Sequence, residues 1–430
     1  MTVDFGAPVG RITDDSREAG GETAFLATRL NERFRDEAKE RGARIVTPAE
    51  LIDALRLRDV EVVGITGTNG KTTTAAAIYS MLLDLGYKAA LQGTRGFFVN
   101  DEKLEAKSHT TPPSLATIRN LWEAKKREAE FFVMEVSSHA IDQERIEGLD
   151  FSLKIHTNVT SDHLDYHGSV EAYRAVKSAF FQDESRKLIN RDEEILKFNP
   201  KNAYGYGLEN PATYKVMAYT LGGGVSGVIQ HFQEVATFET PLQGHFNLYN
   251  VTAAIAAVHL LTGEDLGDIC EVAENFGGVA GRMETVSTEP LVIVDFAHTE
   301  DGIKQVLDSL KEKELRVVFG AGGDRDRSKR PKMGFAAATM AKKVYLTSDN
   351  PRGEDPETII EEIASGIQEQ EKVVKIPDRR EAIARAIADM QPGEALLVLG
   401  KGDETYQEVG GEKIPFDDRE VIREILRRGR

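Results

Sequence analysis

The sequence predicts an α/β protein of three domains, in which strands and helices alternate. One run of alternation begins at VEVVGIT (60–66), and a second begins after GRMETV (281–286). Such alternation is typical of mostly parallel sheets with helices on both faces. The chain has 430 residues, which suits two or three domains with their own cores. We expect a small N-terminal α/β domain (1–58), a central parallel-sheet domain (59–282) and a C-terminal α/β domain (283–430).

Each expected element follows from the local pattern of apolar residues. In the first domain we expect a charged helix at 31–41 and a strand at ARIVT (43–47). Short runs of β-branched and apolar residues that end in glycine or polar residues predict the strands of the other domains. In the central domain these strands are expected at 60–66, 87–94, 131–138 and 153–160, with helices ending near 86 and at 113–129. In the C-terminal domain strands are expected at 291–298, 316–323, 343–350 and 395–402, with helices at 299–314, up to 341, at 356–370 and at the C-terminus.

Composition excludes several classes of function. The net charge is −17, from 54 basic and 71 acidic side chains, and nucleic-acid binding requires a basic face. Cys270 is the only cysteine, which rules out a disulfide framework and a cysteine-rich zinc site. We see no signal peptide and no apolar run near the roughly 20 residues of a membrane helix. The expected protein is cytoplasmic and monomeric, without nucleic acid and without membrane insertion.

The stretch VVGITGTNGKTTTAAAI (62–78) predicts a phosphate site. A glycine-rich turn between a strand and a helix points backbone N–H groups and the helix N-terminus at phosphate oxygens. A lysine there reaches the outer phosphates, and a following hydroxyl can ligate magnesium. The P-loop pattern is only partly met, since Ile65 occupies its first glycine position. The expected nucleotide contacts are Gly67, Thr68, Asn69, Gly70, Lys71, Thr72 and Thr73.

Three further residues suggest a magnesium site beside this loop. Glu135 ends a buried-type strand, His163 follows the next strand, and Lys177 lies on a later helix. A carboxylate at a strand end beside a P-loop is a suitable second ligand for nucleotide-bound magnesium. Each residue also has a plain alternative: a strand-end acid, a structural hydrogen-bonding histidine and a solvated helix lysine. The residues alone do not decide between these readings.

The motifs together resemble the Mur ligase family. GTNGKTT, EVSSHAIDQER, TNVTSDHLDYHG, GHFNLYN, GRME, DFAHT, GAGGDRDRSKRP and SDNPR occur in the family order, and the resemblance extends from DSR (15–17) to GKGDE (400–404). It is closest to the branch that adds the third residue of the peptidoglycan stem peptide. The resemblance implies an ATP-dependent amide ligase that works through an acyl phosphate. It also implies a UDP-binding first domain, a P-loop ATPase domain and a Rossmann-like third domain that binds the amino acid.

The resemblance assigns roles position by position. Lys71, Glu135, His163 and Lys177 match catalytic residues, and Thr72, Glu135, His163 and Lys177 match the surroundings of Mg²⁺, with Lys177 carbamylated by CO₂. Further ATP contacts are expected at Asn247, Asn250, Arg282, Asp295 and His298. Contacts to the substrate UDP-N-acetylmuramoyl-L-alanyl-D-glutamate are expected at Ser16, Thr110, Thr111, Ser137, Gln143 and Arg145.

SDNPR (348–352) indicates meso-diaminopimelate as the added amino acid. Diaminopimelate-adding members of the family carry this form, and lysine-adding members usually lack the arginine. Arg352 would pair with the second carboxylate of diaminopimelate, whereas an arginine would repel a lysine side chain. Expected contacts to the amino acid are Arg325, Asp349, Asn350, Pro351, Arg352, Gly400 and Glu404. Asp403 departs from the family, which usually has histidine at this position.

Three alternatives remain at this point. One is the same ligase with lysine or another diamino acid. Another is a ligase like folylpolyglutamate synthase, which shares the ATP domain but not the DSR, HTTPP and DNPR motifs. The third is a motor or switch NTPase, which would hydrolyse nucleotide without any amino acid.

Overall fold

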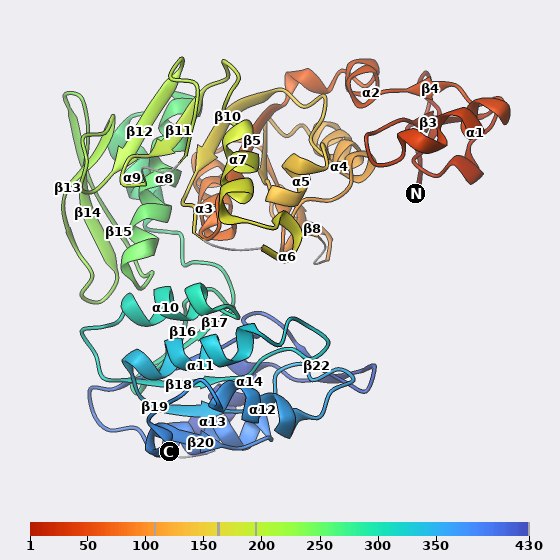
Figure 1. The fold of residues 1–430 in the computed structure, drawn as a ribbon. Coiled ribbons are helices and arrows are strands. Elements are labelled where there is room, and N and C mark those ends of the chain that lie inside the picture. Colours follow the sequence, from red (N-terminus) through yellow and green to blue (C-terminus); the bar gives the residue numbers. More distant parts are fainter. Residues whose placement is uncertain (107–108, 161–163, 194–195, 429–430) are drawn as a thin grey trace. The chain divides into compact units, whose positions relative to one another are not determined.

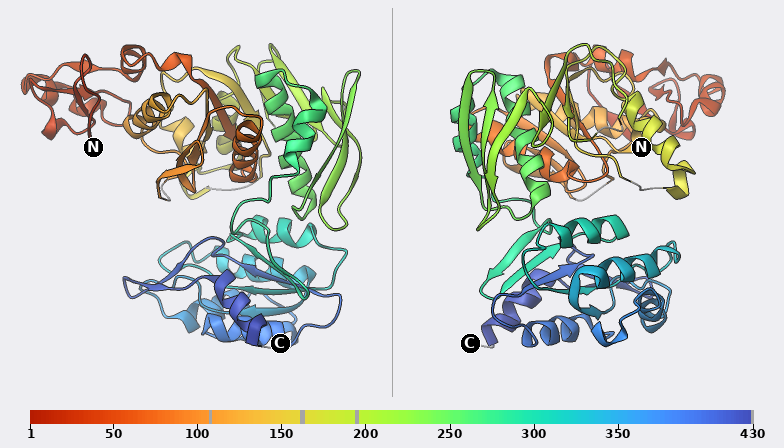
Figure 2. Two further views of the ribbon diagram at one scale, coloured as in Figure 1. Left: turned by 180° about the vertical axis from the view of Figure 1, so that it is seen from behind. Right: turned by 60° about the vertical axis from the view of Figure 1, so that its left-hand side comes forward.

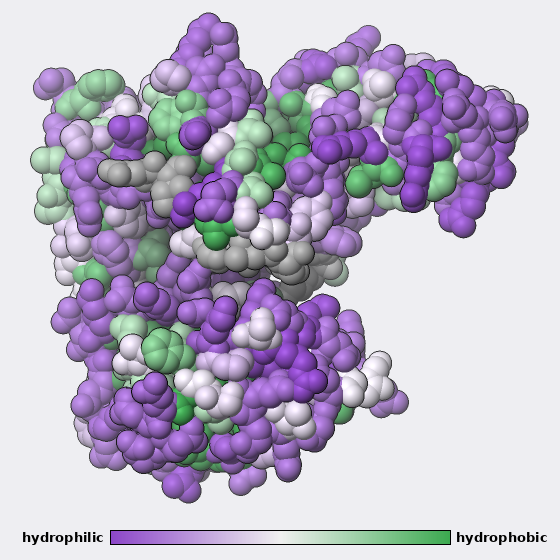
Figure 3. All heavy atoms as spheres, in the orientation of Figure 1, coloured by the Kyte–Doolittle hydropathy of each residue, from purple (hydrophilic) through white to green (hydrophobic). Residues whose placement is uncertain are grey.

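The computed structural model describes residues 1–106, 109–160, 164–193 and 196–428. The chain forms two compact units (Figure 1). The first comprises 1–220, 226–240 and 248–276, and the second comprises 221–225, 241–247 and 277–430. No helix in the described part of the chain is long and apolar enough to cross a membrane. Hydrophilic side chains cover most of the visible surface of each unit (Figure 3).

The N-terminal segment of the first unit builds a small sheet with neighbour order β1-β2-β3-β4. β1 pairs antiparallel with β2, and the other two pairings are parallel. Its elements are β1 (Thr2–Asp4), β2 (Arg11–Thr13), β3 (Thr23–Leu26), α1 (Arg35–Glu40), β4 (Ile45–Val46) and α2 (Pro48–Ala54). This sheet shares part of its core with the rest of the unit, and Phe25 and neighbouring alanines form a small cluster of their own. Phe5 packs edge-to-face on Trp122, with ring centroids 5.1 Å apart. Ile12, Leu26 and Leu51 belong to the same buried cluster as residues of the central sheet.

The central sheet has 11 strands in the described residues, in the order β15-β14-β13-β12-β11-β10-β5-β9-β6-β7-β8. Its strands are β5 (Glu61–Thr66), β6 (Ala89–Gly93), β7 (Gly96–Val99), β8 (Glu102–Glu105), β9 (Phe131–Glu135), β10 (Phe151–His156), β11 (Lys187–Asn190), β12 (Ala203–Gly207), β13 (Tyr214–Thr220), β14 (Val225–His231) and β15 (Glu234–Thr240). Its middle is parallel, with antiparallel pairs at the β13–β14 and β6–β7–β8 ends. The parallel pairing brings the carboxyl ends of β5, β9 and β10 to one edge, where ligands bind in such sheets.

Helices cover this sheet. They are α3 (Lys71–Asp84), α4 (Ser114–Lys126), α5 (Ser138–Asp142), α6 (Leu164–His167), α7 (Val170–Ala179), α8 (His245–Thr262) and α9 (Leu266–Ala273). Figures 1 and 2 show α8 and α9 lying against the antiparallel strands. The long middle of α8 is made of apolar residues that are fully buried, because it packs on several sides.

The second unit is a sheet in the order β16-β17-β21-β18-β19-β20, parallel except for β16. Its elements are β16 (Glu284–Thr288), β17 (Leu291–Asp295), α10 (Glu300–Asp308), β18 (Leu315–Phe319), α11 (Lys329–Met340), β19 (Ala341–Leu346), α12 (Pro356–Ala364), β20 (Val373–Lys375), α13 (Arg379–Ala388), β21 (Ala395–Leu399), β22 (Tyr406–Val409), β23 (Glu412–Pro415) and α14 (Asp418–Arg428). Side chains alternate across β17: Ile293 packs with α10–α12, whereas Val292 and Val294 pack with α13 and α14. Helices therefore cover both faces, and the predicted α/β class with parallel sheets is confirmed. The predicted domain boundaries stay a prediction.

Candidate active site

The predicted phosphate loop connects β5 to α3. Gly70 has a positive φ of 84°, a conformation that glycine adopts without strain. Gly67 has no room for a side chain, because an added Cβ would lie 1.8 Å from Oγ1 of Thr157. Lys71 folds back over the loop, and its Nζ donates to the carbonyl oxygens of Gly67 and Thr68 at 2.8 Å each. The loop thus has the tight glycine turn, the helix N-terminus and the lysine that a phosphate site needs.

The loop is held by the residues that follow β10. The backbone N–H of Asn69 donates to Oδ1 of Asn158 at 2.9 Å, and the hydroxyl of Thr157 donates to the carbonyl oxygen of Asn69 at 2.6 Å. The hydroxyl groups of Thr68 and Tyr173 lie 3.0 Å apart. These bonds fix the loop in one conformation, so its N–H groups are oriented in advance.

Glu135 links the loop to the neighbouring strand ends. Its carboxylate is 2% exposed, and its Oε2 accepts a hydrogen bond of 2.9 Å from the Thr72 hydroxyl. Its Oε1 accepts a 2.8 Å bond from the backbone N–H of Thr94, whose hydroxyl lies 3.1 Å from that of Thr110. A hydroxyl and a carboxylate side by side at a P-loop are the oxygen ligands that Mg²⁺ prefers. The residues present therefore fit a nucleotide-bound magnesium ion.

Lys177 of α7 is buried beside the same strand ends. It is 1% exposed, and its Nζ lies 3.5 Å from Oγ1 of Thr66 and 4.9 Å from the centroid of the Tyr173 ring. The plain alternative of a solvated helix lysine is therefore wrong. His156 is also fully buried, and burial together with Lys177 lowers its pKa to about 3. His163, the third predicted residue of this group, lies outside the described residues.

All the residues predicted to hold the UDP-sugar peptide except Ser16 form one network around Glu135. The hydroxyl of Thr111 donates to the carbonyl oxygen of Glu135 at 2.9 Å and lies 3.3 Å from the Ser137 hydroxyl. The guanidinium of Arg145 donates to the carbonyl oxygen of Thr111 at 2.8 Å and to Oε1 of Gln143 at 2.7 and 2.9 Å. Burial lowers the pKa of Arg145, although the side chain stays cationic at neutral pH. The structure thus holds this cation in a fixed orientation, connected to the phosphate loop through Thr111 and Glu135.

Two predicted residues of the first unit have separate surroundings. Ser16 is buried in the N-terminal sheet region and donates to Oε2 of Glu37 at 2.9 Å.

Asn250 of α8 lies against the start of α3, where its Oδ1 accepts a 3.4 Å bond from Thr74. A Cβ on Gly70 would lie 2.3 Å from that oxygen. Asn250 therefore supports the phosphate loop directly. Asn247, three residues earlier on the same helix, belongs to the second unit and donates to the carbonyl oxygen of Gln243 at 2.8 Å.

In the second unit, Asp295 organises the turn after β17. Its two oxygens accept bonds of 2.7 Å from the backbone N–H groups of Met283 and Ala297. Burial raises the pKa of Asp295, and the nearby Arg282 opposes that rise. Arg282 lies over the Phe296 ring, 4.6 Å from its centroid. His298 is exposed, and its Nδ1 lies 2.8 Å from the carbonyl oxygen of Phe296.

The predicted amino-acid residues cluster at the carboxyl ends of β19 and β21. The side-chain amide of Asn350 donates to Oε2 of Glu404 at 2.9 Å. The fully buried Lys401 donates to Oδ1 of Asn350 at 3.0 Å and to Glu404 at 3.1 Å. Oδ1 of Asp349 lies 3.8 Å from Nζ of Lys401, and burial raises the pKa of Asp349 against the opposing charges of Arg379 and Lys401. Gly400 has a φ of 108°, and a Cβ there would lie 2.5 Å from the Asp349 carboxylate.

Arg352 follows the buried Pro351 and is half-buried. It has a positive φ of 53° and forms an ion pair with Glu408, with Nε 3.1 Å from Oε2. Its Nη1 donates to the carbonyl oxygen of Gly323 at 2.7 Å. These bonds use two of the five N–H groups of a guanidinium. Arg325, the second predicted carboxylate partner, is exposed.

Sequence reasoning did not single out several residues that complete these sites. Thr94, Asn158 and Tyr173 hold Glu135 or the loop, and Lys401 connects Asn350 with Glu404. Lys401 lies inside the motif GKGDE, and Asn158 lies inside TNVTSDHLDYHG. Thr94 and Tyr173 contact the site through tertiary packing and carry no local signal.

Comparison with known proteins places this geometry in a family. The Mur ligase middle domain matches residues 65–258, and the Mur ligase glutamate ligase domain matches residues 281–402. UDP-N-acetylmuramoyl-L-alanyl-D-glutamate--2,6-diaminopimelate ligase of Wolinella succinogenes is 55% identical, over 96% of this chain and 96% of that protein. The protein of the same name from Helicobacter pylori is 47% identical, over 96% of this chain and 94% of that protein.

Solved structures agree. A 2,6-diaminopimelate ligase of the same name superposes with a TM-score of 0.70 at 32% identity, covering 100% of this chain and 97% of that chain. Folylpolyglutamate synthase of Mycobacterium tuberculosis gives a TM-score of 0.65 at 18% identity, covering 82% of this chain and 91% of that chain, a likeness of fold alone. With relatives this similar over nearly its whole length, the chain belongs to the Mur ligase family.

Proposed function

We propose that this protein is an ATP-dependent amide ligase that joins meso-diaminopimelate to UDP-N-acetylmuramoyl-L-alanyl-D-glutamate. The hydrogen-bonded chain from Thr72 through Glu135 and Thr94 to Thr110 carries the proposal. It connects a nucleotide phosphate loop to a polar region that also holds the cation of Arg145. A substrate carboxylate bound in this region would lie close to the terminal phosphate of ATP at the loop, as phosphoryl transfer requires. The names of the close relatives supply the substrates.

The proposed reaction requires the substrate carboxylate and the terminal phosphate of ATP to be held side by side. The substrate carboxylate attacks the terminal phosphorus of ATP, the bond from that phosphorus to ADP breaks, and an acyl phosphate forms. The amine of the amino acid then attacks the acyl carbon and loses a proton. The tetrahedral intermediate collapses to an amide and inorganic phosphate. Lys71 and the loop N–H groups offset the charge on the phosphates, and Arg145 orients the carboxylate-bearing substrate.

Thr72 and Glu135 would hold Mg²⁺, with Lys177 and His163 in its surroundings. The metal supplies charge neutralisation between phosphate and carboxylate oxygens. We assign to Lys177 a carbamate formed with CO₂, which replaces an ammonium by a carboxylate-like group. Its burial at the ends of β5 and β10 supports this assignment, because burial penalises the charged ammonium form of a lysine. Arg282, Asp295, His298, Asn247 and Asn250 remain our assignments for nucleotide contacts.

In the second unit, Arg352 would bind the distal carboxylate of diaminopimelate through its remaining N–H groups, with Arg325 as a second cation. Glu404, Asn350 and Asp349 would receive the distal ammonium, since carboxylate and amide oxygens accept from it. Lysine has no distal carboxylate to satisfy Arg352. This difference favours diaminopimelate over lysine. A monomer in the cytoplasm, where ATP and nucleotide sugars are available, is part of the same proposal.

The decisive experiment measures phosphate release with ATP, magnesium and UDP-N-acetylmuramoyl-L-alanyl-D-glutamate, with meso-diaminopimelate or L-lysine added. We expect release that requires both the UDP-sugar peptide and diaminopimelate. Release with lysine alone would keep the ligase and reject the role of Arg352. Release without either substrate would instead indicate an ordinary NTPase.

A further inference from the structure

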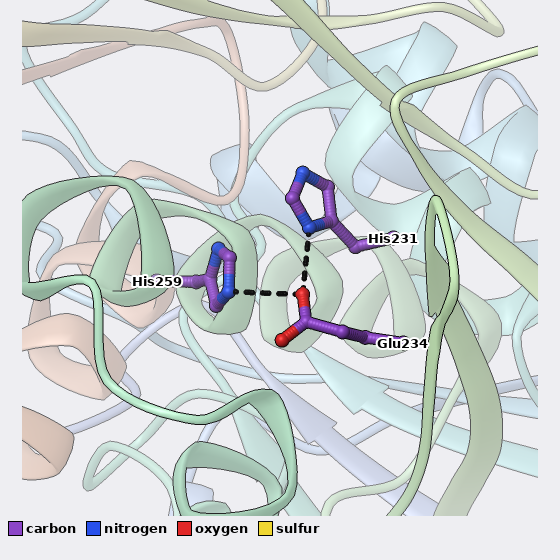
Figure 4. A group of neighbouring side chains, drawn as sticks. All are labelled: His231, Glu234 and His259. Atoms are coloured by element: carbon purple, nitrogen blue, oxygen red, sulfur yellow. Dashed lines mark hydrogen bonds and ion pairs between the residues drawn. The ribbon is translucent and has the colours of Figure 1, made fainter.

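A second cluster of metal-ligating side chains lies in the first unit, on elements that do not form the phosphate loop. His231 ends β14, Glu234 begins β15 after a two-residue link, and His259 lies on α8. Each offers one ligand atom, and these atoms all lie within 4.8 Å of one another. Figure 4 shows the three side chains pointing toward a common centre, two from the hairpin and one from the helix.

The distances suit a small metal ion. Oε2 of Glu234 lies 3.0 Å from Nδ1 of His231 and 3.4 Å from Nε2 of His259. Ligands about 2.0 Å from a tetrahedral zinc ion lie about 3.3 Å from one another. Small side-chain movements would therefore bring all three atoms to bonding distance. Glu234 is 45% exposed, so water can complete the coordination, whereas the histidines are 16% and 13% exposed.

Tyr214 fixes both imidazole rings from behind. Its hydroxyl lies 2.7 Å from Nδ1 of His259, which leaves Nε2 directed toward Glu234. Its ring stacks on His231 with a centroid distance of 4.5 Å and an interplanar angle of 9°. Tyr214 is fully buried. Outer partners of this kind set the tautomer and orientation of metal-binding histidines.

We propose that His231, Glu234 and His259 bind a divalent transition-metal ion of the zinc class. Two imidazoles and one carboxylate suit Zn²⁺, Ni²⁺, Cu²⁺ or Fe²⁺, whereas Mg²⁺ prefers oxygen ligands. The site is therefore chemically distinct from the magnesium site at Thr72 and Glu135. A bound ion would tie the β14–β15 hairpin to α8, the helix that carries Asn250 against the phosphate loop. The competing reading is a metal-free cluster in which Glu234 accepts hydrogen bonds from both rings.

The test uses the full-length protein, stripped with EDTA and then saturated with Mg²⁺ to occupy sites that prefer oxygen ligands. Isothermal titration with Zn²⁺ should show one tight site, and Co²⁺ should give the visible absorption of a site with nitrogen ligands. His259→Gln should weaken Zn²⁺ binding by more than about 100-fold, and Tyr214→Phe by about 10-fold, the range typical of outer partners. Glu239→Gln, an exposed carboxylate on the same strand, is the control and should bind as the parent does.

Thermal unfolding gives a second readout that does not depend on ligase activity. Zn²⁺ should raise the melting temperature of the parent and of Glu239→Gln but not of Glu234→Gln. Because Glu234 is partly exposed, its variant should fold even if a histidine variant does not. The proposal fails if the Mg²⁺-saturated parent binds no Zn²⁺, or if Glu234→Gln binds it with unchanged affinity.

Discussion

The hydroxyl of Thr72 donates a 2.9 Å hydrogen bond to Oε2 of Glu135, although the two residues lie on different βα units. The parallel register explains this contact, since Glu135 at the end of β9 pairs with Ile65 near the end of β5. The first residues of α3 therefore start beside the carboxylate. Burial of Glu135 at 2% exposure keeps solvent from competing with a metal ion for its oxygens.

Glu135→Gln should reduce ligase turnover by at least about 100-fold, because removing a metal ligand costs more than removing an outer partner. Glutamine keeps the size of the side chain and can still accept from Thr94, so the melting temperature should change little. Steady-state phosphate release is the measurement. Glu130→Gln, at the exposed residue just before the same strand, is the matched control. Turnover close to the parent would remove Glu135 from the metal site.

Lys177→Ala should nearly abolish turnover, because the carboxylate-like carbamate would be lost. Added short carboxylates should restore part of the activity, since they can occupy the space of the missing side chain. Phosphate release with and without acetate or formate measures this effect, and circular dichroism checks the fold. A variant that turns over normally would exclude Lys177 from the mechanism. An inactive, folded variant that no carboxylate rescues would argue against the carbamate.

Arg352→Ala should raise the KM for meso-diaminopimelate by about 10- to 100-fold, which corresponds to the about 1.5–3 kcal/mol of a hydrogen bond to a charged group. The KM for ATP should stay the same. Glu408→Gln should lower the KM for diaminopimelate, because it removes the carboxylate that pairs with Arg352. Arg327→Ala is a suitable control, since that arginine pairs with Glu362 on the surface. An unchanged KM in Arg352→Ala would contradict the specificity assignment.

Glu394→Gln should destabilise the second unit near neutral pH by about 3 kcal/mol, because the buried Arg316 would lose its charged partner. Burial raises the pKa of Glu394, but hydrogen bonds from Arg316 and Lys342 outweigh it and lower that pKa from 4.5 to about 2. A depressed carboxylate pKa stabilises the fold above the unfolded value and loses this effect as pH falls through the folded value. The difference between parent and variant should therefore shrink between pH 4.5 and pH 2.

Urea unfolding at several pH values measures this difference. Glu314→Gln serves as its control, because Glu314 lies on the surface and also pairs with Lys342. A gap between parent and Glu394→Gln that stays constant down to pH 2 would refute the linkage.

The sequence predicted β5, β6, β9 and β10 and, in the second unit, β17, β18, β19 and β21, because each is a short apolar run that ends at a glycine or polar residue. The parallel strands β11, β12 and β20 were not predicted. The strand expected at 131–138 ends at Glu135, since Ser137 instead caps α5 by accepting from the N–H of Ala140. The antiparallel strands β13–β15 were not predicted. They carry exposed apolar side chains such as Met217 and Val235, which obscure a period of two.

The sequence predicted only those site residues that lie in its motifs. Glycines, Lys71 and Thr72 carry a local signal, and the resemblance supplied Lys177. Partners such as Thr94 and Tyr173 depend on which strands are neighbours, which no local pattern encodes. The cluster of His231, Glu234 and His259 was missed for the same reason, because its third member comes from a separate helix.

The shared core of the first unit limits how far this enzyme can be treated as a set of interchangeable modules. The contact of Phe5 with Trp122 and the burial of Leu26 and Leu51 in the central cluster join part of the N-terminal core to the central sheet, whereas Phe25 packs in a small cluster of its own. A chimera that exchanges residues 1–58 for those of a relative would have to carry matching changes on α4. Sequence change in this segment is thus coupled to the packing of the central sheet.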